Sequence, residues 1–135
     1  MISWIKMYTV TLIVFLVSDF VWLAFISKKI YAKHLGYIMT ENVVWWAAIL
    51  FYLLFVAGLV FFVIDPALRR QSLEYAAYAG AFFGLITYAT YDLTNLATLK
   101  NWPIIITVLD LMWGAFVSTF TSSISYIVIK KIFTI

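Results

Sequence analysis

Four apolar stretches, separated by tight clusters of charged residues, constrain the fold of this chain more than any other feature. They cover residues 7–27, 43–64, 73–99 and 104–129. A helix needs about 20 mostly apolar residues to cross a lipid bilayer, and each stretch is long enough. Charged residues make up 11% of the chain and hydrophobic residues 66%, a balance far from that of water-soluble domains. The sequence therefore predicts an integral membrane protein of the all-α class.

The residues between these stretches are of the kinds that end and begin helices. We expect the first span to stop at the Lys28–Lys29 pair and the second to stop at Asp65–Pro66. Asn42 and Ser72 have side chains that cap helix N-termini, and Pro103 suits a first helical position. The sequence thus predicts where each span begins and ends.

The three connections are short, which makes consecutive helices antiparallel neighbours. Residues 1–135 are therefore predicted to form one domain, an antiparallel four-helix transmembrane bundle. Basic residues flank the spans on both sides: Lys6, Arg69, Arg70, Lys130 and Lys131 on the side of the termini, and Lys28, Lys29, Lys33 and Lys100 on the other. The positive-inside rule favours cytoplasmic termini, by five residues against four.

The composition excludes several kinds of site and partner. The chain has no cysteine, so a disulfide or a thiolate metal site cannot form. A single histidine, His34, excludes a zinc site made of several histidines and a bis-histidine haem within one chain. The net charge of +3 comes from residues at helix ends, which indicates contact with membrane lipids and not with nucleic acid.

Three carboxylates interrupt the apolar spans: Asp19, Asp92 and Asp110. A charged side chain at mid-span costs about 2.5–3.5 kcal/mol on insertion scales, so such residues face the interior of a bundle and often serve function. At a rise of about 1.5 Å per residue, all three are predicted roughly 10–14 Å below the same membrane face. No lysine or arginine lies inside a predicted span to balance them.

Such carboxylates need a retained proton, hydrogen bonds from neutral donors, or a shared bound cation. A cation held by Asp19, Asp92 and Asp110 is the one cofactor that the sequence suggests. Candidate neighbours three or four residues from an aspartate on the same span are Trp22, Tyr88, Asn95, Thr107 and Trp113. Tyr91 lies on the adjoining stripe of the third span, and Tyr52 reaches a similar depth from the second span. Inter-helix hydrogen bonds of this kind also serve packing alone, and that structural interpretation stays open.

Two shorter patterns concern how the helices pack. Asp19 and Asp110 both begin the pattern D-x-x-W-x-A-F, which is an inverted internal repeat or a coincidence in an aromatic-rich chain. Ala76, Gly80 and Gly84 form a ridge of small residues that allows close approach of a neighbouring helix.

The run from Tyr88 to Leu99, followed by Trp102–Pro103, resembles the signature of a bacterial membrane-protein family, domain of unknown function 2177. The elements Asp19-x-x-Trp22, Asp110-x-x-Trp113-Gly114 and Phe51-Tyr52-Leu53-Leu54 are similar to that family as well. The resemblance covers almost the whole chain. It implies a four-span protein of the bacterial cytoplasmic membrane and implies no activity.

Three functions compete on these observations. The first is a binding or transport protein, in which Asp19, Asp92 and Asp110 take up a proton, a cation or a cationic small molecule. Four spans enclose little volume, so transport favours a homo-oligomer or a membrane partner. The second is a non-catalytic accessory or assembly protein. The third is an enzyme acting on a lipid or isoprenoid, against which stands the lack of an acidic cluster and of a basic pair for phosphate.

Overall fold

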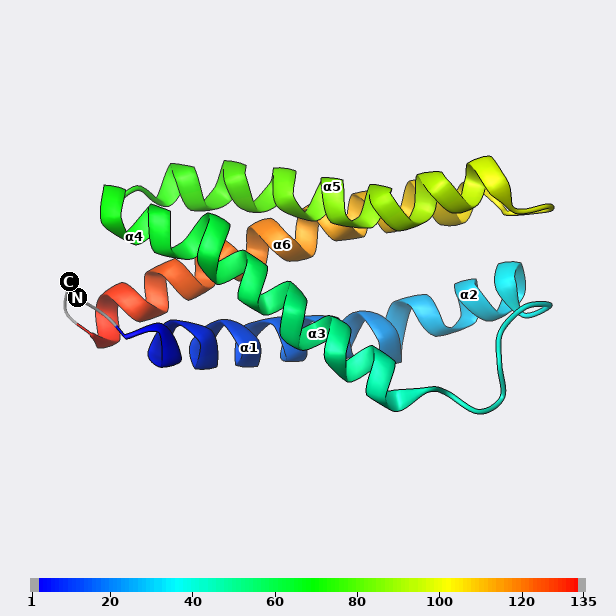
Figure 1. The fold of residues 1–135 in the computed structure, drawn as a ribbon, viewed down its shortest axis with the longest axis horizontal. Helices are drawn as coiled ribbons and strands as arrows, with labels where there is room; N and C mark the ends of the chain where they lie inside the picture. Colours follow the sequence, from blue (N-terminus) through cyan, green and yellow to red (C-terminus); the bar gives the residue numbers. More distant parts are fainter. Residues whose placement is uncertain (1–2, 134–135) are drawn as a thin grey trace.

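The computed structural model describes residues 3–133, which form four helical rods in one antiparallel bundle and include no strand (Figure 1). Each of the first two rods contains a π-helical turn. The elements are α1 (Trp4–Val21), η1 (Trp22–Ser27) and α2 (Lys28–Leu35) in the first rod, α3 (Trp45–Leu59), η2 (Val60–Ile64) and α4 (Asp65–Arg70) in the second, then α5 (Leu73–Thr98) and α6 (Ile104–Ile132). The predicted fold class, an all-α membrane bundle, is confirmed.

Contacts between distant residues close both ends of the bundle. At one end the Lys6 ammonium lies 5.0 Å from the centre of the Phe133 ring. At the other end the Tyr37 hydroxyl donates to the backbone carbonyl of Asn101 at 2.6 Å. The segment after α2 and the turn between α5 and α6 therefore lie together, as predicted from the alternation of the spans (Figure 1).

The closest packing joins α5 to α6, because small residues on α5 face α6. A Cβ atom added to Gly84 would lie 2.0 Å from the Gly114 carbonyl oxygen, and one added to Gly80 would lie 2.9 Å from the Ser118 carbonyl oxygen. Ala76, one turn earlier, is fully buried. The predicted ridge of small residues is thus the face through which the two helices meet.

The second rod packs closely at one end and diverges at the other. Val56, Leu59 and Val60 are fully buried in the apolar core. The first turns of α3 instead lie away from α5, as Figure 1 shows, and Trp45 and Trp46 there are about 70% exposed. This divergence leaves room between α1, α3 and α5 near the end that carries Tyr37.

The helices are longer than the predicted spans. The first rod continues through Lys28–Lys29 to Leu35, and α6 continues through the next lysine pair to Ile132. Water-exposed charges end the apolar stretch without breaking backbone hydrogen bonds, so the helix continues. At the N-termini, Ser72 caps α5 as predicted, with its Oγ accepting from Tyr75 N at 3.0 Å. Two caps differ, since Val44 and not Asn42 precedes α3, and Pro103 lies one residue before α6.

The prediction that the second span stops at Asp65–Pro66 is wrong. The helix runs through Pro66 to Arg70. Proline removes the hydrogen bond to the carbonyl four residues earlier, here that of Phe62. That residue lies in the π-helical turn η2, and its carbonyl instead accepts from the Tyr75 hydroxyl at 3.3 Å. A wider turn and a side-chain donor therefore let the chain continue as a helix.

By length and composition, three of the rods qualify to cross a membrane: Trp4–Leu35, Trp45–Arg70 and Ile104–Ile132. The fourth, α5, has 26 residues and is long enough, but its tyrosines, threonines, Glu74, Asp92 and Asn95 make it more polar. Its packing along the whole of α6 places it in the same bundle (Figure 1).

Candidate functional site

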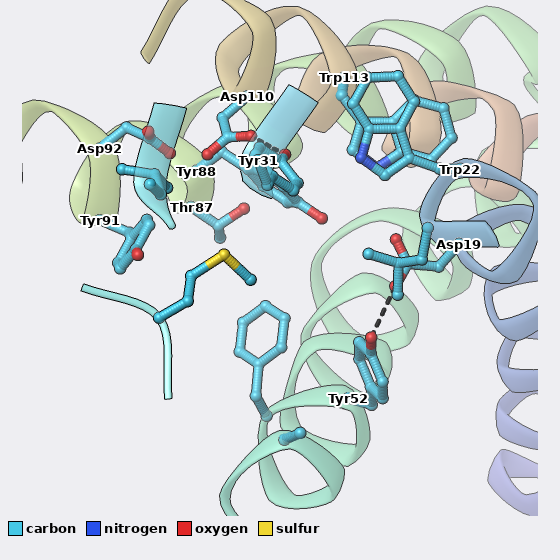
Figure 2. A pocket seen from close by; sticks show the side chains of 15 residues that line it. Asp19, Trp22, Tyr31, Tyr52, Thr87, Tyr88, Tyr91, Asp92, Asp110 and Trp113 are labelled. Carbon is cyan, nitrogen blue, oxygen red and sulfur yellow. Dashed lines mark hydrogen bonds between the residues drawn. The ribbon is translucent and has the colours of Figure 1, made fainter. Parts of the chain in front are cut away.

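Asp92 and Asp110 meet because the small residues fix how α5 and α6 are aligned. Gly84 faces Gly114, and Tyr88, one turn later on α5, lies against the same glycine. Because α5 and α6 are antiparallel, residues further along α5 lie beside residues nearer the start of α6. Asp92 therefore lies at the same level as Asp110 and Thr107. The Thr107 hydroxyl lies 3.5 Å from the Asp92 carbonyl oxygen. Figure 2 shows the carboxyl groups of Asp92 and Asp110 pointing toward each other.

The two carboxylates of this pair differ in their partners. Asp110 is 7% exposed and accepts a hydrogen bond from the Tyr31 hydroxyl of α2. Asp92 has no exposed surface, and neither of its carboxylate oxygens has a hydrogen-bond partner among the described residues. A buried polar group without a partner costs stability, so an unpaired carboxylate of this kind points to function.

Asp19 lies apart from the pair and has its own donor. Its carboxylate is 7% exposed and accepts from the Tyr52 hydroxyl of α3 at 2.7 Å. Figure 2 shows Asp19 and Tyr52 at one end of the site, with Asp92 and Asp110 at the other. The chain therefore has one carboxyl pair and one separate carboxylate.

The indoles of Trp22 and Trp113 stack between these two groups, with ring centroids 4.4 Å apart and planes at 7°. Each tryptophan follows an aspartate of the bundle by three residues, on helices that run in opposite directions. The two D-x-x-W elements found in the sequence thus meet in space. The π-helical turn η1 begins at Trp22, and the Trp113 Nε1 is buried without a hydrogen-bond partner in the described part of the chain.

A cavity of about 620 Å³, the aspartate cavity, lies between these groups (Figure 2). Its lining combines three carboxylates, six tyrosine or tryptophan side chains, one threonine and five apolar residues: Asp19, Trp22, Leu23, Tyr31, Leu35, Met39, Ala48, Phe51, Tyr52, Thr87, Tyr88, Tyr91, Asp92, Asp110 and Trp113. Met39 and Tyr91 are about half exposed, at 54% and 56%, whereas Asp92 is fully buried. The cavity wall therefore includes both buried carboxylates and half-exposed side chains.

The structure brings most of the residues predicted for the site into the cavity wall. Those present are Asp19, Trp22, Tyr52, Tyr88, Tyr91, Asp92, Asp110 and Trp113. Asn95 lies outside the lining, beside Tyr91. Thr107 lies behind the wall, where its hydroxyl accepts from the Trp102 Nε1 at 3.0 Å.

Sequence reasoning missed Tyr31, which donates to Asp110. The residue lies beyond Lys28–Lys29, where the first span was expected to end. The spacing of the sequence could have identified Tyr31. It follows Asp19 and Ser27 at multiples of four residues, so all three fall on one side of the helix if that helix continues past the lysine pair. Ser27 is buried on that side.

The carboxylates do not group into a metal centre. Within residues 3–133, no set of three or more His, Cys, Asp or Glu side chains is placed to hold a metal ion.

Comparison with known proteins agrees with this architecture. The family model described as "Predicted membrane protein (DUF2177)" matches residues 4–127, which include α1 to α5 and most of α6. No curated protein and no solved structure matches the chain. Because the match spans nearly the whole bundle, the chain belongs to this family of membrane proteins, domain of unknown function 2177.

Proposed function

We propose that this protein binds a small organic cation inside the membrane, as a step in its transport. One observation carries the proposal: the three buried aspartates line one cavity of about 620 Å³, and no lysine, arginine or histidine among residues 3–133 lines it. Within this described part of the chain, the carboxylates of the wall have no positive side chain beside them in the lining. A cationic ligand would supply the missing counter-charge.

The size of the cavity separates this proposal from its alternatives. Pockets of about 300–1,000 Å³ are typical of sites for small organic molecules. A proton needs no cavity, and a metal ion needs several oxygen ligands close together. The arrangement of one carboxyl pair and one separate carboxylate suits an elongated molecule better than a single ion.

Aromatic side chains make the wall suitable for an organic cation. Trp22, Trp113, Phe51 and Tyr88 line the cavity together with the carboxylates. The face of an aromatic ring attracts a cation, by about 0.5–2 kcal/mol depending on how far water is excluded. The half-exposed rim at Met39 is apolar, so we propose a ligand with an apolar part beside its charge.

We further propose that the protein lies in a bacterial cytoplasmic membrane with both termini in the cytoplasm, and that it acts as a homo-oligomer. The family resemblance and the five basic residues on the side of the termini, against four on the other, support this placement. The aspartate cavity within one bundle is small, which is a reason for several copies to act together in transport.

Equilibrium dialysis of the purified protein in detergent tests the proposed binding directly. The probe is benzyltrimethylammonium, which has a permanent charge and an aromatic ring. We expect saturable binding by the parent and binding weaker by at least about tenfold for Asp92→Asn, because a buried charge partner is lost. Asp65→Asn is the matched control, since Asp65 lies outside the cavity and pairs with Arg69 at 3.0 Å.

Neopentylbenzene, in which carbon replaces the ammonium nitrogen, tests whether charge matters. Equal affinity for the two probes, or equal affinity of Asp92→Asn and the parent, would contradict the proposal. That outcome would favour an accessory protein in which the acids only hold helices together. The bonds from Tyr52 to Asp19 and from Tyr31 to Asp110, each joining two rods, are the observations in favour of that second function.

A further inference from the structure

The Asp92–Asp110 pair lacks a hydrogen-bond donor between its two carboxylates, and a single bound proton would supply one. The two carboxyl groups point toward each other (Figure 2), yet neither carboxylate oxygen of Asp92 has a hydrogen-bond partner among the described residues. Ionised carboxylates only accept hydrogen bonds, so two of them cannot bond to each other. If Asp92 holds a proton, its hydroxyl becomes a donor to Asp110 and the fully buried side chain is satisfied.

The surroundings assign the proton to Asp92 and not to Asp110. Tyr31 of α2 already donates its hydroxyl hydrogen to Asp110. A carboxylate that accepts hydrogen bonds from two donors is held in its ionised form. Asp110 is therefore the acceptor of the pair, and Asp92 is its proton carrier.

Among residues 3–133, no positively charged side chain lines the cavity to balance a second ionised carboxylate. The titratable side chains that face the pair are Tyr31 of α2, and Tyr88 and Tyr91 of α5. Asp19 of α1 and Tyr52 of α3 occupy the far end of the same cavity. All of these are neutral or acidic, so both carboxylates of the pair ionise only when a cation enters.

We propose that binding of an organic cation in the aspartate cavity expels one proton from the Asp92–Asp110 pair, so that the site exchanges a proton for its ligand. This inference rests on the proposed function. The O–H bond of Asp92 breaks, its electron pair stays on the carboxylate, and the proton passes to water. The pair gains one negative charge while the ligand brings one positive charge, so the net charge of the cavity with its contents does not change.

Proton release on binding is the direct test. Benzyltrimethylammonium, which carries no titratable proton, is added to the protein in weakly buffered detergent solution with a pH indicator dye. We expect acidification that saturates together with binding and approaches one proton per bound cation. Raising the pH favours release of the proton, so affinity should increase by up to about tenfold per pH unit.

Two variants locate the source of the proton. Asp92→Asn has no carboxyl proton to release at this position, so its binding should be weaker and the same at pH 6 and pH 8. Asp19→Asn should still release a proton, because Asp19 is separate from the pair. Release from Asp92→Asn equal to that of the parent would overturn the assignment.

The same titration distinguishes failure of the proton exchange from failure of the proposed cation binding. Binding by the parent without acidification, at an affinity that does not change with pH, overturns proton exchange and leaves cation binding in place. Absence of binding at every pH overturns both. The measurement on the parent alone decides between these results, so the test stands even if Asp92→Asn does not fold.

Discussion

Tyr52 and Tyr31 each place a hydroxyl from one rod on a carboxylate of another. In lipid these bonds matter because water is not available to replace a lost partner. Tyr52 is the donor to Asp19 at 2.7 Å, and the Asp19 carboxylate is almost fully buried. The Tyr52 hydroxyl therefore helps to stabilise the contact between α1 and α3, together with the Tyr8 hydroxyl, which donates to the Leu53 carbonyl at 2.8 Å.

We predict that Tyr52→Phe destabilises the bundle by about 1 kcal/mol, because the buried Asp19 loses its donor. Asp19→Asn should cost less, since an amide oxygen still accepts from Tyr52. Thermal unfolding midpoints in detergent measure both effects. Tyr78→Phe serves as control, because Tyr78 is 75% exposed; a midpoint for Tyr52→Phe as high as that of the control would contradict the prediction.

At the scale of the elements, α5 and α6 hold the site through backbone contact. A Cβ atom at Gly84 would meet the Gly114 carbonyl oxygen, which cannot move without shifting the helix. One at Gly58 would meet the Phe83 ring at 2.7 Å, and a side-chain ring can turn away. The two glycines therefore differ in how strongly they resist substitution.

Gly84→Ala should lower the unfolding midpoint more than Gly58→Ala, and Gly84→Leu should prevent close packing of α5 and α6 altogether. Leu85→Ala should have a small effect, since Leu85 is 40% exposed. A shift of α5 along α6 would also separate Asp92 from Asp110, so Gly84→Ala should weaken binding of the cation probe. Equal unfolding midpoints for Gly84→Leu and Leu85→Ala would contradict the role of the small-residue ridge in packing α5 against α6.

The number of helices and the similar depth of Asp92 and Asp110 follow from the sequence. Counting residues from Lys100 and Pro103 places both aspartates at similar depth on neighbouring helices, and the structure keeps that relation. The helix ends do not follow as well, because Lys28–Lys29 marks the end of the apolar stretch and not the end of the helix. Tyr31 was missed for this reason.

The separation of Asp19 from the pair depends on tertiary geometry that residue counting does not contain. Asp19 precedes a π-helical turn, which changes how the following residues face the bundle. Its neighbours are also set by the angle at which α3 crosses α1 (Figure 1). Local sequence patterns identified the residue, but only the packed helices show which group it faces.

At the scale of the whole molecule, the bundle places its two ends on opposite sides of the membrane if α5 crosses it. Lys6 and Phe133 are at one end, and Tyr37 and Asn101 are at the other. The more polar composition of α5 fits a helix whose Tyr88, Tyr91 and Asp92 line an internal cavity. We therefore expect four crossings, with the small residues and Asp92 of α5 buried inside the bundle.

Single cysteines introduced into this cysteine-free chain test the topology. Glu74→Cys lies at the start of α5 and Lys100→Cys follows its end. With intact cells and a membrane-impermeant maleimide, we predict labelling of Lys100→Cys and protection of Glu74→Cys until the membrane is permeabilised. Labelling of both from the same side would show that α5 does not cross, and a reversed pattern would place the termini outside.

The stacked indoles of Trp22 and Trp113 give the protein a built-in optical signal. Two chromophores 4.4 Å apart with nearly parallel planes couple their electronic transitions, which splits an absorption band into a pair of circular-dichroism bands of opposite sign. A molecule that enters beside Asp19 or Asp110 and separates the rings would weaken this couplet. Because each indole belongs to a different helix, the amplitude of the couplet would report in real time on the relative movement of α1 and α6.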